Sequence, residues 1–310
     1  MKRMSGDDPQ RRGVAAAKLP MPSITHRLLR ACGHLPLPGI RGAVWRAHAL
    51  LGLSRSANFQ TSFFGVTYRG RLDDLIDWHV FFFGSYCPAE LDFLAAAATE
   101  TRGRAGGTTY VDVGANVGHH ALFMSQRASQ VIAFEPAVSA RERFEANIRL
   151  NGIANLRLLP IALADHDGEA RLGSGFAGNS GSRSLCWTLD HNKDECVTLR
   201  RGDDLFCHEK LSQIDILKLD VEGYEKSVLV GLRETLLRDR PIILIELIGE
   251  SSKGGFRDEA DLRNTLYPAH ALFTLSGARR AKLGAFDWNA EAAVCLPEER
   301  VQAFRHLFSA

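Results

Sequence analysis

From Thr108 onwards, short apolar runs alternate with amphipathic segments, and this alternation limits the fold more than any other feature of the chain. The runs are continuously apolar, so both faces of each strand must be covered, as in a parallel sheet with helices on both sides. The pattern therefore predicts a doubly wound α/β domain. The predicted strands are Tyr110–Val113, Val131–Phe134, Leu156–Leu163, Ile214–Leu219 and Ile242–Leu247, and the predicted helices are Ala121–Ala128, Val138–Asn151 and Tyr224–Leu237.

Two later β-like runs, Ala271–Leu275 and Ala292–Leu296, are expected to pair as an antiparallel hairpin at one edge of the sheet. The predicted fold is α/β, with a mostly parallel Rossmann-like sheet and a small N-terminal cap region. Residues 1–22 are predicted to be a mobile basic tail, residues 23–98 a helical and aromatic cap region, and residues 99–310 the α/β domain.

Positive charge is concentrated at the start of the chain. Residues 1–55 contain ten Lys or Arg against Asp7 and Asp8, a net charge of +8, whereas the whole chain carries +2 at pH 7. Packing of this segment on its own domain is the commoner arrangement, and weak peripheral contact with an anionic membrane is the alternative. The chain as a whole offers no strong field for nucleic acid.

Targeting signals and cysteine usage bear on the compartment. No apolar stretch approaches the roughly 20 residues of a transmembrane helix, and no apolar signal-peptide core precedes a cleavage site. The six cysteines are scattered without a C-x-x-C pair, which fits free thiols in a reducing compartment. We expect a cytoplasmic protein.

The first predicted strand runs into the turn Asp112-Val-Gly-Ala-Asn-Val-Gly118. Gly114 and Gly118 permit a sharp turn and close backbone approach, and the following helix begins with free N–H groups, so a nucleotide-like ligand is indicated. The spacing is not the G-x-G-x-x-G of dinucleotide-binding proteins. Glu135 ends the second strand 23 residues after Asp112, close to the offset of an acid that binds ribose hydroxyls.

Carboxylates stand at the ends of several predicted strands, where ligands of open α/β sheets bind. An anionic pyrophosphate would be repelled by such a rim, whereas the sulfonium and ammonium groups of S-adenosylmethionine would be attracted. A divalent cation would satisfy the same rim by another route, and we assign no metal ligand. The rim consists of Asp112, Glu135, Asp220, Glu222 and Glu246.

Seven short motifs stand in the order seen in FkbM-type methyltransferases, and the chain resembles this family from about Phe81 to Leu247. The motifs are Asp112–Gly118, Ala133–Pro136, Asn147–Gly152, Ala162–Asp165, Asn179–Gly181, Leu217–Gly223 and Pro241–Glu246. The resemblance implies a class I S-adenosylmethionine-dependent methyltransferase fold. It also implies O-methylation of a hydroxyl on a saccharide, glycolipid or polyketide-like acceptor.

The resemblance further implies which residues contact S-adenosylmethionine. Glu135 would hold the ribose hydroxyls and Asp165 would contact adenine, although a turn-initiating role for Asp165 stays open. The residues assigned to the methionine and ribose end of the cofactor are Asp112, Gly114, Asn116 and Gly118.

Lys218 and Asp220 share one face of a predicted strand because side chains alternate with period two, and Glu222 follows just past the strand end. We expect these three residues to be catalytic. Asp220 would be the general base for the acceptor hydroxyl, or the ligand of a metal that acidifies it. Cofactor binding or helix capping by Asp220 is equally open.

Two other functions stay open at this point. One is an NAD(P)-dependent oxidoreductase, against which the absent glycine motif and the acidic rim count. The other is a protein that binds S-adenosylmethionine without turning it over, but Lys218, Asp220 and Glu222 favour an enzyme. A small-molecule or glycan acceptor is expected rather than nucleic acid, because the α/β domain lacks arginine clusters with stacking aromatics.

Overall fold

The computed structural model describes residues 21–308 except 36, 38, 104–105, 177, 187–189, 210–212, 248–253 and 267–269. The tail predicted at residues 1–22 therefore lies outside the described residues, apart from its last two. None of the described helices is long and apolar enough by itself to cross a membrane. Only α3 (Leu75–Phe83) and α4 (Pro88–Thr101) taken together reach that length and composition, with a bend of 81° between them.

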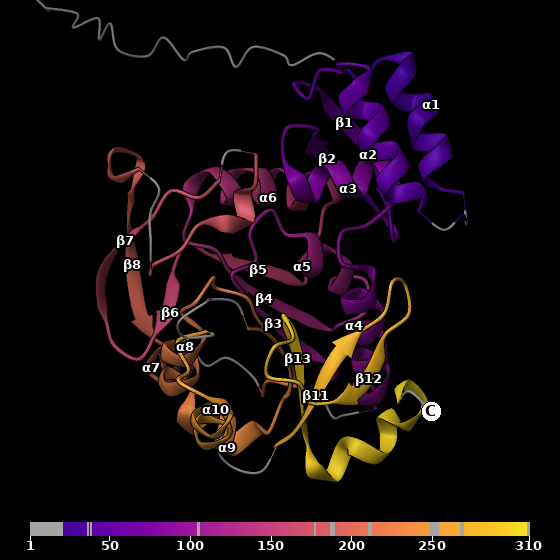
Figure 1. Ribbon diagram of the computed structural model, residues 1–310. Helices are drawn as coiled ribbons and strands as arrows, with labels where there is room; N and C mark the ends of the chain where they lie inside the picture. Colours follow the sequence, from indigo (N-terminus) through magenta and orange to yellow (C-terminus); the bar gives the residue numbers. More distant parts are fainter. Residues whose placement is uncertain are drawn as a thin grey trace, which may run out of the picture.

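An eight-stranded sheet lies at the centre of the molecule, in the order β12-β11-β13-β10-β9-β3-β4-β5 (Figure 1). Its parallel strands are β3 (Thr109–Val113), β4 (Gln130–Phe134), β5 (Leu156–Leu159), β9 (Ile216–Leu219) and β10 (Ile242–Glu246). Its antiparallel strands are β11 (His270–Ser276), β12 (Lys282–Ala285) and β13 (Ala292–Pro297). The predicted mostly parallel α/β sheet with an antiparallel edge is confirmed.

Two cores cover the two faces of this sheet. Tyr110 and Ile216 belong to one core, which includes α4, α5 (His119–Met124) and α6 (Val138–Asn151). Val111 and Leu217, one residue further along the same strands, belong to the other core. The second core includes α7 (Gly202–His208), α8 (Glu225–Gly231), α9 (Arg233–Asp239) and α10 (Glu259–Thr265). Every residue of β3 and β9 is buried, as two-sided coverage requires.

Two predicted elements are each divided in the structure. The run Leu156–Leu163 forms β5 and then β6 (Ala162–Ala164), because Pro160 has no N–H to continue the ladder. β6 leaves the main sheet and joins β7 (Gly168–Leu172) and β8 (Glu195–Arg201) in a three-stranded sheet of order β6-β8-β7. The helix predicted over Tyr224–Leu237 is α8 and α9, which meet at Leu232.

The antiparallel edge also differs in detail from the expected hairpin. β11 and β13 pair with each other as predicted. However, β13 lies between β10 and β11, and β12 pairs with the outer side of β11. The turn from β11 to β12 therefore projects at the edge of the sheet, on the side where α4 packs against β11 (Figure 1).

The N-terminal cap contains α1 (Ile24–Gly33), α2 (Ile40–Leu50), the hairpin of β1 (Asn58–Phe63) and β2 (Val66–Arg71), and α3. Its aromatic residues are mostly core: Phe59, Tyr68 and Trp78 are each at most 2% exposed. Hydrogen bonds join the cap to α6. Asn147 and Asn151 donate to and accept from the backbone of β2, so the cap is fixed against the α/β domain.

A buried ion-pair network reinforces this junction. Arg143 of α6 pairs with Asp74 at 3.1 Å and also with Asp77, and both carboxylates belong to the start of α3. Burial raises the pKa of Asp77 to about 6, although Arg143 lowers it. The boundary predicted between residues 98 and 99 falls within α4, whose buried residues belong to the same core as the cap.

Candidate active site

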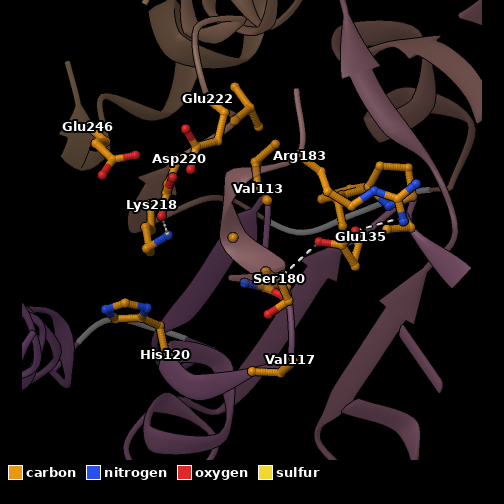
Figure 2. Close-up of a pocket in the computed structure, with 18 of the residues that line it drawn as sticks. Val113, Val117, His120, Glu135, Ser180, Arg183, Lys218, Asp220, Glu222 and Glu246 are labelled. Atoms are coloured by element: carbon orange, nitrogen blue, oxygen red, sulfur yellow. Dashed lines mark hydrogen bonds and ion pairs between the residues drawn. The ribbon is translucent and has the colours of Figure 1, made fainter. Parts of the chain in front are cut away.

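A pocket lies at the carboxyl ends of β3, β4, β9 and β10, where the strand order changes direction (Figure 2). The residues that follow these four strands form its floor. The start of α4 and residues 179–185 form its other walls. This is the position at which open α/β sheets bind their ligands.

The turn after β3 depends on its two glycines. Gly114 has a φ of +78°, and a Cβ there would stand 1.8 Å from the Asp220 carbonyl oxygen. Gly118 has a φ of +86°, and a Cβ there would stand 2.1 Å from the Phe144 ring of α6. Only glycine therefore allows this turn to pack between the exit of β9 and helix α6.

Glu135 ties the ends of β3 and β4 together. Its two carboxylate oxygens accept hydrogen bonds from the backbone N–H groups of Asn116 and Ala137, each at 2.7 Å. Burial raises its pKa to about 7, although these two bonds and nearby Arg183 and Arg141 lower it. Each oxygen can accept a second bond, so Glu135 can fix the loop and still receive a ligand hydroxyl.

Lys218 is the buried cation of the site. Its Nζ donates to Asp220 Oδ2 at 2.9 Å and lies 3.8 Å from Asp112 Oδ1. Burial alone would lower the pKa of Lys218, but Asp220, Asp112 and Glu90 raise it above the ordinary value. Burial would likewise raise the pKa of Asp220, yet Lys218 and a hydrogen bond with Glu246 bring it down. An ammonium–carboxylate pair therefore forms the floor.

The other carboxyl groups of the floor hold protons more tightly. Burial, the Asp220 charge and the hydrogen bond with Asp220 raise the pKa of Glu246, so it is neutral and donates to Asp220. Burial, Asp220 and Glu225 raise the pKa of Glu222 to about 8, against the opposing effect of Lys218. The rim is thus less negative than its residues suggest, and it becomes more negative when a cation approaches.

Three of these carboxyl groups lie close enough to share a metal ion. One oxygen each of Asp220, Glu222 and Glu246 lies within 4.8 Å of the others. Such oxygen donors suit a hard divalent cation. The Lys218 ammonium already supplies a positive charge beside Asp220, so the cluster has an internal counter-ion.

Two neighbouring histidines lie on the opposite wall. His119 is buried, and burial together with His120 and Lys218 lowers its pKa well below the ordinary value. Its Nε2 accepts a hydrogen bond from the Tyr86 N–H at 3.2 Å, so the neutral ring carries its proton on Nδ1. His120 Nε2 lies 2.9 Å from Glu90 Oε2.

Residues 179–182 close the pocket against the cap. The Gly178 carbonyl accepts from the Leu75 N–H at 2.8 Å, and the Ser180 N–H donates to Asp74 at 3.3 Å. A Cβ at Gly181 would lie 3.2 Å from Asn116 Nδ2. The start of α3 therefore positions this loop directly beside the glycine turn.

Several polar atoms in the pocket have no internal partner among the described residues. They include both amide atoms of Asn116, His119 Nδ1, Ser180 Oγ, Arg183 Nε and Glu246 Oε2. Because buried polar groups are normally hydrogen-bonded, this set indicates a ligand with several donors and acceptors. A ligand with ribose hydroxyls, a carboxylate and an ammonium has the groups to satisfy them.

The structure brings most residues predicted from the sequence to this pocket. Asp112 and Gly118 stand outside the described lining: Asp112 is fully buried near Lys218, and Gly118 packs against the Phe144 ring. Asp165 lies outside the lining, where its carboxylate accepts from Ser227 Oγ at 2.9 Å and pairs with His166 at 2.7 Å. The roles predicted for these three residues toward the cofactor stay predictions. The predicted residues that line the pocket are Gly114, Asn116, Glu135, Lys218, Asp220 and Glu222.

One wall is only partly predicted from the sequence: the aromatic stretch that contains Tyr86 could be core or substrate wall, whereas nothing singles out Cys87, Glu90 or Arg183. Tyr86, Cys87 and Glu90 reach the pocket from the start of α4, and Arg183 reaches it from the loop after residue 182. Glu90 stands in the first helical turn after Pro88, a common position for an acid near a helix N-terminus. That local signal does not indicate a ligand site, because only the tertiary packing brings α4 to the ends of β9 and β10.

The chain is similar to known methyltransferases. Residues 112–274 match the family model described as the methyltransferase FkbM domain. The 2-O-methyltransferase NoeI of Sinorhizobium fredii is 28% identical over 146 residues, 42% of this chain and 59% of the relative. The AMB antimetabolite synthetase AmbE of Pseudomonas aeruginosa is 28% identical over 199 residues, 52% of this chain and 9% of the relative. The chain thus spans less than two thirds of each relative.

Among solved structures, a methyltransferase FkbM from Methylobacillus flagellatus aligns with a TM-score of 0.42 and 13% identity. The alignment covers 87% of this chain and 77% of that one.

Proposed function

The chain belongs to the FkbM methyltransferase family, and on this premise we propose that it moves a methyl group from S-adenosylmethionine to a hydroxyl of a small-molecule or glycan acceptor. One observation carries the proposal. The segment that matches the family supplies the glycine turn, Glu135 and the Lys218–Asp220–Glu222 group to a single pocket. The 2-O-methyltransferase relative supports an oxygen acceptor.

The pocket fits the proposed donor through its own polar groups. Glu135 keeps lone pairs for ribose hydroxyls, and the free amide of Asn116 lies beside it. Ser180 and Arg183 offer donors suited to the amino-acid carboxylate. When bound, S-adenosylmethionine supplies an electrophilic methyl group on a positively charged sulfur.

The chain's own residues would position the acceptor and receive its proton. Asp220 is held by Lys218 and by the Glu246 hydrogen bond, which supports a positioning role in place of the base role predicted from the sequence. Glu222 has a pKa of about 8 and lines the pocket. A base is best matched to its task when its pKa is near the working pH, so we assign proton removal to Glu222.

The compartment is part of the proposal. All six cysteines are free thiols, and five of them are at least partly exposed. Exposed free thiols persist in reducing surroundings, which supports the cytoplasm as the place of action.

Calorimetric titration tests donor binding. We expect S-adenosylmethionine and S-adenosylhomocysteine to bind, and NAD and NADP not to bind. Glu135→Gln should weaken donor binding about tenfold or more, since one of the two oxygens that can accept from the ribose hydroxyls becomes an amide nitrogen that only donates. Glu169→Gln, which changes an exposed residue of β7 outside the pocket, is the matched control. Binding of NAD without binding of S-adenosylmethionine would refute S-adenosylmethionine as the methyl donor.

Turnover needs a separate assay. The protein is incubated with isotope-labelled donor and a cell extract, and the metabolite that gains a methyl group is identified by mass spectrometry. We expect release of S-adenosylhomocysteine and an alkali-stable methyl ether. Tight donor binding with no turnover across extracts and a panel of sugars, lipids and polyketides would instead identify a binding protein.

A further inference from the structure

A second cavity of about 560 Å³ adjoins the active-site pocket. It lies between the start of α2, the start of α4 and the turn from β11 to β12. Tyr86, Cys87 and Glu90 line both spaces. A molecule seated in this second cavity can therefore present one of its groups to the floor of the active site.

Two arginines from distant parts of the chain line this cavity. Arg41 stands in the first turn of α2, and Arg279 stands in the β11–β12 turn. Among the described residues, no carboxylate forms an ion pair with either of them. Burial lowers the pKa of Arg41, and repulsion from Arg279 lowers it further against the opposing effect of Cys87, so the two guanidinium groups are close enough to repel each other.

The neighbouring arginine of the same turn provides a contrast. Arg280 pairs with Asp92 of α4 at 2.9 Å, and the other Asp92 oxygen accepts from the Ala281 N–H at 2.9 Å. These bonds fix the turn to α4. Arg280 therefore has the structural role, and it does not line the cavity, whereas Arg279 has no such anchor.

Helix α2 adds a third source of positive potential. Gly39 and Ile40 at its N-terminus line the cavity, the helix has no side-chain cap, and no acid stands in its first turn. Unsatisfied N–H groups and the helix dipole favour an anion at such an end. Glu90 is the one acidic residue among those described in the lining, and it lies against His120 at the active-site side.

We propose that this cavity binds a phosphate group of the methyl acceptor, so that the substrate is a phosphorylated sugar or a related phosphate ester whose hydroxyl enters the active site past Tyr86 and Glu90. Two guanidinium groups and a helix N-terminus match the double charge of phosphate better than the single charge of a carboxylate. The inference rests on the proposed methyl transfer, since it names the acceptor class for that site.

Anion binding is measured first, on protein saturated with S-adenosylhomocysteine. Inorganic pyrophosphate is titrated by calorimetry at constant ionic strength. We expect Arg41→Gln and Arg279→Gln each to raise the Kd at least tenfold. Arg46→Gln, which removes the same charge from an exposed position of α2 outside the cavity, should change it less than twofold. Equal effects of all three variants would overturn the proposal, because they would show only a general charge effect.

Acceptor chemistry is tested in the extract assay. The methylated product should be retained on an anion exchanger, and phosphatase treatment of the extract before the reaction should abolish labelling. A retained product that forms despite combined phosphatase and phosphodiesterase treatment would show that the charge of the acceptor is not a phosphate, and labelling of the neutral fraction at the same rate would show that no anion is required. Either result overturns the phosphate site.

The donor titration separates this inference from the proposed function. Arg41→Gln and Arg279→Gln should bind S-adenosylmethionine as the unmodified protein does, and Arg41→Lys should restore part of the pyrophosphate affinity. Methylation of neutral acceptors with normal donor binding refutes the phosphate site alone. Failure of the unmodified protein to bind the donor refutes the proposed function.

Discussion

Replacing Lys218 by methionine tests the electrostatics of the active-site floor. The change removes an ammonium that lies 2.9 Å from Asp220 and 3.8 Å from Asp112. Asp220 is 32% exposed at its side chain and keeps the hydrogen bond from Glu246. Asp112 is fully buried, and burial already raises its pKa against the effect of Lys218. We therefore expect most of the loss of stability in the variant to come from Asp112, which is left without its ammonium partner.

Protonation of Asp112 limits that cost and makes it depend on pH. An aspartate has an ordinary pKa of 3.8, and each pH unit above that value adds about 1.4 kcal/mol to the free energy of protonation. The free energy of unfolding of the variant should thus be lower than that of the unmodified protein by up to about 4 kcal/mol at pH 7 and by up to about 2 kcal/mol at pH 5. The sign follows from linkage: a raised folded-state pKa means that the folded variant binds the extra proton, so its stability falls as pH rises.

The assay is urea denaturation of both proteins at pH 5, 6, 7 and 8, with the difference in free energy of unfolding taken at each pH. Taking differences removes the contribution of Glu135, whose raised pKa does not depend on Lys218. The pKa of Glu222, which Lys218 lowers, rises further in the variant and adds to the loss of stability with rising pH. Lys226→Met is the control, because that lysine forms a partly exposed pair with Asp261. Lys226→Met should lower the free energy of unfolding by less than about 1 kcal/mol at every pH. If Lys218→Met lowers the free energy of unfolding by the same amount at pH 5 and at pH 8, the assignment of the cost to Asp112 is refuted.

Three further outcomes follow from the same contacts. Gly118→Ala should destabilise by about 2–4 kcal/mol in urea denaturation, because its Cβ would stand 2.1 Å from the Phe144 ring, whereas Gly103→Ala, with open space around it, should be nearly neutral. Glu222→Gln should lower kcat about 10²–10⁴-fold and remove the rise of kcat with pH centred near 8; an unchanged pH profile would exclude Glu222 as the base. Arg143→Met should cost about 3–5 kcal/mol, since two buried carboxylates of the cap lose their partner, and limited proteolysis should then release the cap first.

The secondary structure of the α/β domain could be predicted because its signals are local. The helix predicted over Val138–Asn151 has those bounds in the structure and ends at Gly152 in the left-handed conformation. The continuous apolar runs became buried parallel strands for the same reason. Pro160 was also visible in the sequence, but the departure of β6 to a second sheet depends on which strands are available as neighbours.

In the candidate site, too, some features could be predicted from the sequence and others could not. Side-chain alternation was enough to place Lys218 and Asp220 on one face, and their hydrogen bond is present. The protonation states could not be read in this way. The raised pKa of Glu222 and the neutral form of Glu246 arise from burial and from three carboxyl groups gathered from two strands, which only the folded chain creates.

By itself, then, the sequence determined the class of fold, the glycine turn and the acids that follow the strands, because each is encoded within a few neighbouring residues. The tertiary structure alone decided that the start of α4 lines the active site, that β13 inserts between β10 and β11, and that Arg41 and Arg279 line one cavity. These contacts join residues far apart in the chain, and local periodicity contains no information about which distant surfaces bury each other.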